Sequence, residues 1–352
     1  MIRNKFNQRL LKLHTNLWEI IAQLDEIKGN WVAEIQLAPQ ILERLKRSIL
    51  ITSTGASTRI EGARMTDQEV DKLIKGLRIK TWTERDQQEV QGYYEVLKNV
   101  FDAWEVIPFS ENSIKHLHQE MLKYAEKDAR HRGNYKKMEN QVIARDATGK
   151  TIGIVFDPVS AYLTPKAMQE LTEWTADALK NRSHHPLLII GNFIVEFLNI
   201  HPFQDGNGRL SRILTNLLLL KAGYRYMPYV SHEKLIEERK SDYYMALRNS
   251  QSTFKKGSGN VQLWSTFFLE VLFHQAQMAL KLLQQENIEM ILSEKQLKVW
   301  QYLGTVEEAT PLMISKKTHV GLPTVRQALQ KLMKLKKVER MGAGRGIRYR
   351  RV

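Results

Sequence analysis

The chain has 352 residues, of which 43% are hydrophobic and 26% are charged, and it contains no cysteine. This composition is typical of a soluble globular protein, and the lack of cysteine excludes a disulfide scaffold, a cysteine-ligated zinc or iron–sulfur site and a cysteine nucleophile. The net charge is +15, and residues 293–352 contribute +10 of it, because they hold 14 lysines and arginines but only 4 glutamates. This imbalance predicts a basic C-terminal module, which either contacts nucleic acid or is simply well solvated.

Two features argue against secretion and membrane insertion. The N-terminal segment lacks the apolar core and the small-residue cleavage site of a signal peptide. The most apolar stretch, Leu187–Ile200, is interrupted by polar residues and is too short to span a bilayer. We therefore expect a cytoplasmic protein without a membrane partner.

Helical periodicity dominates the first part of the chain. Apolar residues recur at spacings of three and four in segments 16–24, 39–51, 68–77, 86–104, 113–125 and 165–179. Thr66 and Glu69 have the spacing of a capping box, which predicts the start of a helix, and Ser113 and Thr164 are further candidate caps. The pattern predicts a mainly α fold.

The segment 140–158, NQVIARDATGKTIGIVFDP, departs from the helical pattern. Val142 and Ile143 precede a turn-rich stretch, after which Ile152, Ile154 and Phe156 alternate with other residues. This arrangement predicts one β-hairpin in an otherwise helical protein.

Residues 201–212 read HPFQDGNGRLSR and lie between two apolar helical runs, 186–200 and 210–220. The segment therefore predicts a loop that leads onto a helix N-terminus. The stretch Gly206-Asn207-Gly208 can turn several backbone N–H groups toward one point, where the positive end of the following helix adds to the attraction for an anion. Arg209 and Arg212 are three residues apart and can clamp phosphate oxygens.

Two further side chains of this segment carry chemistry. Asp205 offers a hard oxygen ligand, which suits a Mg²⁺ ion bound to phosphate. His201 can take up a proton near neutral pH. A base, a metal-binding carboxylate, a phosphate-binding loop and two arginines predict phosphoryl or nucleotidyl transfer. The alternative is a plain helix–loop–helix turn with a capping aspartate and surface arginines.

The C-terminal part begins with a Gly/Ser-rich loop at 255–260 and an amphipathic helix over 261–285. Three further helices are predicted at 294–303, after 310–311, and at 324–335, followed by strands at 338–341 and 347–350. This order predicts a winged helix-turn-helix domain over 293–352. Such a domain can bind DNA with its third helix and wing, or it can serve dimerisation or target recognition.

The segment 201–212 resembles the signature of Fic-domain proteins, His-x-Phe-x-Asp/Glu-Gly-Asn-Gly-Arg-x-x-Arg, and matches it at every position. The resemblance extends more weakly over roughly residues 50–255. It implies a helical Fic fold whose motif loop binds ATP with Mg²⁺ and transfers AMP to a protein hydroxyl. His201 would then deprotonate a serine, threonine or tyrosine of the target, and Asp205 would hold Mg²⁺.

The resemblance assigns the other motif positions as well. Gly206, Asn207 and Gly208 would cradle the phosphates, Arg209 and Arg212 would neutralise them, and Phe203 would pack into the core. The loop and the arginines would bind the β- and γ-phosphates, where charge develops as pyrophosphate leaves. Family members that transfer other groups often depart from the full motif, so the intact motif favours AMP transfer. The hairpin at 140–158 would be the family's flap, which docks the target segment as an added strand. An ordinary structural hairpin is the alternative.

Ser57 and Glu61, in the stretch STRIEG, fit the family's inhibitory pattern Ser/Thr-x-x-x-Glu-Gly/Asn. Residues four apart lie on one face of a helix, so Ser57 is expected to help hold Glu61 in place. The resemblance implies that Glu61 pairs with Arg212 and takes the position of the γ-phosphate. The predicted protein is a self-inhibited enzyme, unless this stretch is only a helix surface.

The remaining expectations concern the adenine-binding residues, the domains and the partners. Tyr243 and Tyr244 are candidates to flank the adenine, although aromatic residues at this spacing also occur in cores. The expected division is an N-terminal helical region with the inhibitory helix (1–110), a Fic catalytic core (111–255), a linker helix (256–292) and the winged helix (293–352). The expected partners are ATP and a protein substrate with a hydroxyl side chain, for which the chain itself is one candidate. DNA is a candidate partner of residues 293–352, and a second copy of the chain is expected in a homodimer.

Two other functions compatible with this sequence compete with AMP transfer. The first is a DNA-binding transcriptional regulator whose Fic part acts only as a nucleotide sensor. The second is a Fic enzyme that removes AMP, in which the inhibitory glutamate positions a hydrolytic water. Labelled ATP separates the first from the leading hypothesis, since only a transferase leaves covalent label on protein.

Overall fold

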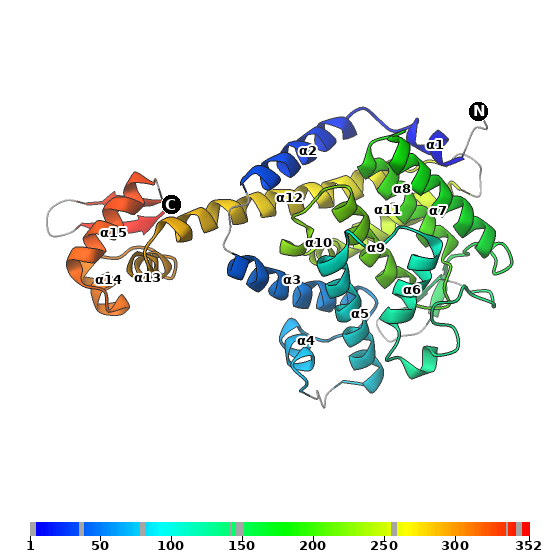
Figure 1. Ribbon diagram of the computed structural model, residues 1–352, viewed down its shortest axis with the longest axis horizontal. Helices are drawn as coiled ribbons and strands as arrows, with labels where there is room; N and C mark the ends of the chain where they lie inside the picture. The colour runs from blue at the N-terminus through cyan, green and yellow to red at the C-terminus, as the bar shows by residue number, and fades with distance from the viewer. Residues whose placement is uncertain are drawn as a thin grey trace. The chain divides into compact units, whose positions relative to one another are not determined.

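Helices make up nearly all of the regular structure in the computed structural model, which describes residues 5–34, 39–77, 82–140, 142–145, 151–254, 259–335, 337–342 and 347–352. The chain forms two compact units, residues 1–280 and 281–352 (Figure 1). Among the described residues, no helix combines the length and the apolar character that crossing a bilayer requires.

The first unit holds α1 to α11 and most of α12. Their bounds are α1 Lys5–Leu10, α2 Leu17–Glu34, α3 Pro39–Ile60, α4 Asp67–Ile74, α5 Glu84–Ala103, α6 Glu111–Met121, α7 Thr164–Asn181, α8 Pro186–Ile200, α9 Asn207–Lys221, α10 His232–Glu238, α11 Lys240–Ser252 and α12 Gln262–Ile291. Two short 3₁₀ turns lie at Glu126–Asp128 and Met227–Tyr229.

The helix α8 lies at the centre of the first unit. Every residue from Leu187 to Ile200 is buried, as expected for a helix that is apolar on all sides. It packs against α7, α9 and α11, and α9 in turn packs against α5 and α6. The buried Glu196 of α8 is neutralised by Arg9 of α1 at 2.7 Å. The loop between α8 and α9, residues 201–206, is therefore held between two core helices.

The helix starts test the predicted caps. The capping box of Thr66 and Glu69 is confirmed, with Thr66 as the N-cap of α4. The prediction for Ser113 is wrong, because Ser110 caps α6 and accepts a bond from the Ser113 N–H at 3.1 Å. The prediction for Thr164 is also wrong. Thr164 already lies in the first turn of α7, and its hydroxyl donates to the Ser160 carbonyl instead.

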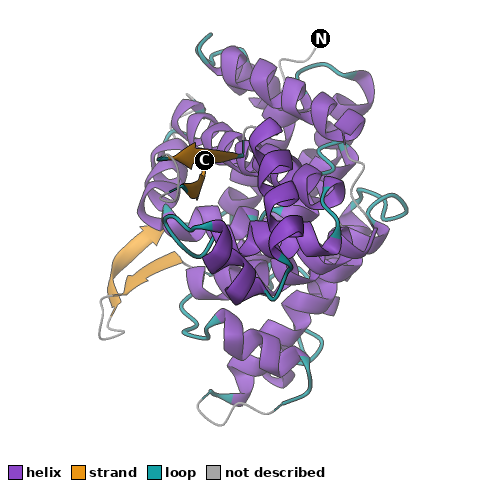
Figure 2. Cartoon of the chain, turned by 90° about the vertical axis from the view of Figure 1, so that its left-hand side faces the viewer, coloured by secondary structure: helices purple, strands orange, loops and turns teal. Residues whose placement is uncertain are grey.

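The predicted hairpin is present as β1 (Val142–Arg145) and β2 (Thr151–Phe156), which pair antiparallel with Val142 opposite Phe156 and Arg145 opposite Thr151. Its turn, residues 146–150, lies outside the described residues. The strands of the described residues form this hairpin and one other (Figure 2). The mainly α prediction is confirmed, with a small antiparallel sheet in the first unit.

The second unit contains α13 (Glu294–Leu303), α14 (Pro311–Thr318), α15 (Leu322–Lys334), β3 (Val338–Met341) and β4 (Arg348–Arg351). Val325, Leu329 and Leu332 of α15 are buried in its core, and Leu335 is partly exposed. The strands β3 and β4 pair antiparallel, and Ala309 bridges to Tyr349 beside them. The tip of this hairpin, 343–346, lies outside the described residues.

Candidate active site

His201 is the residue at which α8 ends. Its backbone is left-handed, with φ 51° and ψ 60°, and its N–H donates to the Phe197 carbonyl at 2.9 Å. The Leu198 backbone acts to raise the pKa of the imidazole. Desolvation, assisted by the charge of Lys136, lowers the pKa of His201 to about 4. At neutral pH the imidazole is uncharged, as a general base must be.

The motif loop is braced from inside. Phe203 is fully buried, as predicted, and its ring stacks on His118 with 3.8 Å between the ring centroids. The Asn207 side chain is also buried and bonds to both backbone groups of Phe203, at 2.9 and 2.8 Å. The Asn207 amide thus closes the loop, so only its backbone N–H could serve the predicted contact with phosphate.

A β-carbon would meet different obstacles at Gly206 and at Gly208. Gly206 is the N-cap of α9 with φ 80°, a conformation that favours glycine, and a β-carbon there would lie 2.8 Å from Met121. A β-carbon on Gly208 would lie 2.2 Å from Oε1 of Glu61. The Glu61 carboxylate therefore rests directly against the first turn of α9, where the helix dipole favours an anion.

Arg212 joins this carboxylate to the inhibitory stretch. Its side chain is buried, and Nη2 lies 2.7 Å from Glu61 Oε1. Ser57 does not take the expected role of holding Glu61. Its hydroxyl instead accepts from Arg212 Nε at 2.8 Å, and its carbonyl accepts from Nη2 at 2.9 Å. Burial opposes the charge of Arg212, but the adjacent Glu61 carboxylate raises its pKa overall.

Asp205 contacts two arginines, of which one belongs to the motif and the other does not. Its Oδ2 contacts Arg209 at 3.2 Å and Arg85 at 3.0 Å. Burial opposes ionisation of Asp205, but Arg209, the Gly206 N–H and Arg85 lower its pKa overall. The second contact of Arg209 is Glu89 Oε2 at 2.7 Å.

The surroundings of Asp205 fit a hard cation. Oxygens of Glu89, Asp128 and Asp205 lie within 4.8 Å of one another. Asp128 is buried, and its Oδ2 has no hydrogen-bond partner among the described residues, although the Arg85 guanidinium approaches to 4.0 Å. Carboxylate oxygens are the ligands that Mg²⁺ prefers. No spacing in the sequence pointed to Glu89 or Asp128, because they come from α5 and from a short 3₁₀ turn.

A cavity of about 130 Å³ opens beside His201 and Gly208. The predicted Tyr243 and Tyr244 both line it, and Tyr243 is also part of the core, where its ring packs against Trp264. Sequence reasoning missed the other walls of this cavity: Phe156, Leu198, Leu247, Arg248 and Gln251. The cavity brings Glu61, the candidate base and the start of α9 to one space.

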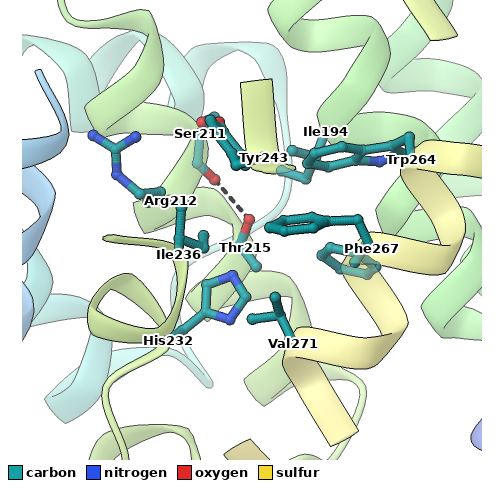
Figure 3. Close-up of a pocket in the computed structure, with 11 residues that line it drawn as sticks. Ile194, Ser211, Arg212, Thr215, His232, Ile236, Tyr243, Trp264, Phe267 and Val271 are labelled. Atoms are coloured by element: carbon teal, nitrogen blue, oxygen red, sulfur yellow. Dashed lines mark hydrogen bonds between the residues drawn. The ribbon is translucent and has the colours of Figure 1, made fainter. Parts of the chain in front are cut away.

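A second cavity lies behind Arg212, between α9, α10 and α12 (Figure 3). Its volume of about 10 Å³ is that of a single water molecule. Most of its wall is apolar, and the Thr215 hydroxyl that faces it donates to the Ser211 carbonyl at 2.8 Å. Burial lowers the pKa of His232 there to about 4. This space is too small for a nucleotide.

Part of the chain, including the motif, is similar to known sequences. Residues 108–219 match the sequence pattern of the Fic/DOC family. The curated proteins named Protein adenylyltransferase Fic from Drosophila mojavensis and Drosophila grimshawi are each 40% identical to this chain over 81 residues. That match covers 23% of this chain and spans only 15% of the length of each relative.

Comparisons with solved structures extend the likeness to the fold. A Fic family protein from Desulfovibrio desulfuricans G20 superposes with a TM-score of 0.61 and 25% identity, over 97% of each chain. A Fic domain-containing signalling protein from Bacteroides thetaiotaomicron VPI-5482 gives a TM-score of 0.61 at 21% identity, over 75% of this chain and 97% of that one. The second likeness concerns the fold alone.

Proposed function

Because the chain contains a Fic domain, we propose that it is a self-inhibited protein adenylyltransferase, which transfers AMP from ATP to a serine, threonine or tyrosine hydroxyl of a protein. The observation that carries this proposal is the position of Glu61. Its carboxylate lies on Arg212 and against Gly208, so an anion already fills the anion-binding position that the motif forms. The acceptors include the protein itself.

The catalytic step follows from the placement of His201. Its neutral imidazole takes the proton of the target hydroxyl, and the oxygen attacks the α-phosphorus of ATP. The bond from this phosphorus to the bridging oxygen breaks, and pyrophosphate leaves. Arg209, Arg212 and the N-terminus of α9 stabilise the charge that develops on the leaving group.

Magnesium ion, when bound, would neutralise phosphate charge. Asp205 would hold it, since its carboxylate is ionised and lies at the start of the phosphate-binding turn. Arg209 now contacts this carboxylate at 3.2 Å and Glu89 at 2.7 Å. To contact a phosphate, Arg209 would have to leave these two carboxylates.

The nucleoside would occupy the cavity beside His201. Tyr243 and Tyr244 offer aromatic surface for the adenine, and Gln251 can donate and accept hydrogen bonds there. The hairpin β1–β2 supports docking of the target, because an extended peptide can add to a strand edge by main-chain hydrogen bonds.

The proposed inhibition is a competition between Glu61 and the γ-phosphate for Arg212. In the proposed inhibited state Glu61 occupies Arg212, so the γ-phosphate cannot bind there and ATP is not oriented for attack. Release of Glu61 frees Arg212 without disturbing His201. The α3 helix, which carries Ser57 and ends one residue before Glu61, is thus the proposed inhibitory helix.

The decisive experiment is incubation of the Glu61→Gly protein with α-labelled ATP and Mg²⁺, alone and with cell lysate, followed by mass spectrometry of labelled proteins. Covalent AMP on a hydroxyl side chain supports the proposal. A protein that binds ATP but labels nothing, and instead releases AMP from a modified protein, would establish removal of AMP in place of addition.

The second unit supports a second candidate function, DNA binding through a winged helix at 293–352. The exposed side chains of α15 and the hairpin that follows include Arg326, Lys334, Arg340, Arg348 and Arg350. Three helices and a basic hairpin suit a helix in the major groove with the hairpin against phosphate. Salt-sensitive DNA binding without any label transfer would favour a regulator that uses the Fic domain as a nucleotide sensor.

A further inference from the structure

The backbone around His201 is held by a short segment that lies outside the motif. Two residues of the loop before β1, Lys136 and Asn140, donate hydrogen bonds to it. The acceptors are the carbonyl oxygens of four consecutive residues: Ile200 (3.1 Å from Lys136 Nζ), His201 (3.4 Å from Asn140 Nδ2), Pro202 (2.8 Å from the Lys136 N–H) and Phe203 (3.0 Å from Asn140 Nδ2). Every carbonyl from Ile200, at the end of α8, to the buried Phe203 therefore accepts a hydrogen bond from this segment.

The two donors also hold each other. Lys136 Nζ donates to Asn140 Oδ1 at 2.8 Å, and the Lys136 side chain is buried, with 3% of the residue exposed. A buried ammonium group is costly unless its hydrogen-bonding groups find partners, and here the partners are Asn140 and the last carbonyl of α8. We call this pair the 136/140 clamp.

His201 needs such support. A left-handed backbone is unfavourable for a residue with a β-carbon, and such conformations persist only when the surrounding structure fixes them. The φ of 51° at His201 turns the chain out of α8, and this turn sets the direction of the imidazole. The clamp bonds to the carbonyls on both sides of that turn.

The same segment forms one end of the β1–β2 hairpin. Asn140 lies two residues before the first residue of β1. Beyond β2, the Ala161 N–H donates to Glu139 Oε1 at 3.0 Å, so the two ends of the hairpin are joined. The hairpin is thus fastened at its base to the loop that carries the candidate base.

We propose that Lys136 and Asn140 are positioning residues for adenylyl transfer, which fix His201 relative to the β1–β2 hairpin so that a target strand paired with the hairpin presents its hydroxyl to the imidazole. This proposal rests on the proposed function of the Fic domain. It adds residues outside the motif and explains how a docking element and a proton acceptor keep a constant separation.

The charge of Lys136 serves the same end. After desolvation, it is the next largest cause that lowers the pKa of His201, and it acts against Glu61 and Asp205, whose charges raise this pKa. Burial lowers the pKa of Lys136 itself to about 8, against the charge of Glu139, so the ammonium is still mostly protonated at pH 7. The clamp therefore helps to keep the imidazole neutral.

The test compares two neighbouring lysines in the released Glu61→Gly protein. Lys136→Met removes the buried ammonium and keeps an unbranched side chain, whereas Lys137→Met removes an exposed one as the matched control. Misplacement of a reacting group by about 1 Å costs about 10²-fold in rate, so we expect Lys136→Met to lower kcat for label transfer by about 10²-fold. The KM for ATP should stay unchanged, because the proposed phosphate contacts lie on α9.

A second readout needs no activity. NMR titration of histidine-labelled protein should show the pKa of His201 raised by Lys136→Met and unchanged by Lys137→Met. A purely structural role would lower the melting temperature and leave this pKa where it is. If Glu61→Gly protein transfers no label at all, the proposed adenylyl transfer fails, while the His201 titration still decides whether Lys136 tunes the imidazole.

A shape-preserving variant guards against misfolding of Lys136→Met. Asn140→Asp keeps the acceptor for Lys136 but loses the donor for the carbonyls of His201 and Phe203, so kcat should again fall with KM for ATP unchanged. A folded Lys136→Met protein with parental kcat and parental His201 pKa would overturn the proposal, and so would parental kcat in Asn140→Asp.

Discussion

Arg212 Nη2 and Glu61 Oε1 lie 2.7 Å apart, although 151 positions separate the two residues in the chain. The same oxygen rests against the α-carbon of Gly208, where a β-carbon would approach it to 2.2 Å. One carboxylate thus contacts both the second motif arginine and the first turn of α9. A γ-phosphate that binds Arg212 has to displace the Glu61 carboxylate. The proposed inhibition therefore depends on this contact.

Removal of this carboxylate should activate the enzyme. We expect Glu61→Gly to raise AMP transfer at least about tenfold, with labelling of the protein itself as the first sign, because productive orientation of ATP improves more than its affinity. Gel quantification of α-labelled protein measures the change. Adding Arg212→Ala should erase most of the gain, since no side chain then orients the freed γ-phosphate. A folded Glu61→Gly protein that is no more active than the parent would contradict the proposed inhibition by Glu61.

Loss of the candidate base should abolish turnover but spare binding. His201→Ala in the Glu61→Gly protein should lower the rate of AMP transfer by about 10²–10⁴-fold, the usual contribution of a positioned general base. Calorimetry should still find ATP bound with nearly the parental affinity, because the arginines and the α9 N-terminus are intact. Near-parental transfer would mean that another group takes the proton.

The lowered pKa of His201 sets the pH dependence of the reaction. The imidazole must be neutral to accept a proton, so activity is retained above the pKa of about 4 and is lost as the pH falls through it. Initial rates at about pH 5.5 and 7.5 should therefore be nearly equal. A histidine with an unperturbed pKa of about 6.5 would instead lose about tenfold between these values. A tenfold loss would contradict the prediction that burial lowers the pKa of His201.

If the second unit binds DNA, its exposed basic side chains should carry the salt dependence. Arg326→Ala and Lys334→Ala, both on α15, should each reduce the slope of log affinity against log salt by about 1 where the side chain neutralises a phosphate. Fluorescence anisotropy with a labelled duplex at several salt concentrations measures the slope. Lys180→Ala on α7 removes an exposed charge from the first unit and should leave the slope unchanged. Equal slopes for all three variants would exclude a DNA-reading role for α15.

Features that depend on residues close together in the chain could be predicted from the sequence alone. The motif from His201 to Arg212 is contiguous, so its residue types and spacing identified the loop and the helix that follows, and the family resemblance implied the burial of Phe203. The apolar run of α8 and the capping box at Thr66 could also be predicted from the sequence, because helix periodicity and capping act over a few residues. The hairpin was found from alternation and turn residues alone.

Contacts between residues far apart in the chain could not be predicted in this way. Ser57 was expected to hold Glu61, but the packing of α3 against the core turns its hydroxyl to Arg212. Arg85 reaches Asp205 from 120 positions away, and Lys136 reaches the end of α8 from 64 positions away. No local pattern encodes such contacts, because each depends on how separate helices and loops pack into one core. Residue types fix what each group can bond to, and packing alone fixes which partner it has.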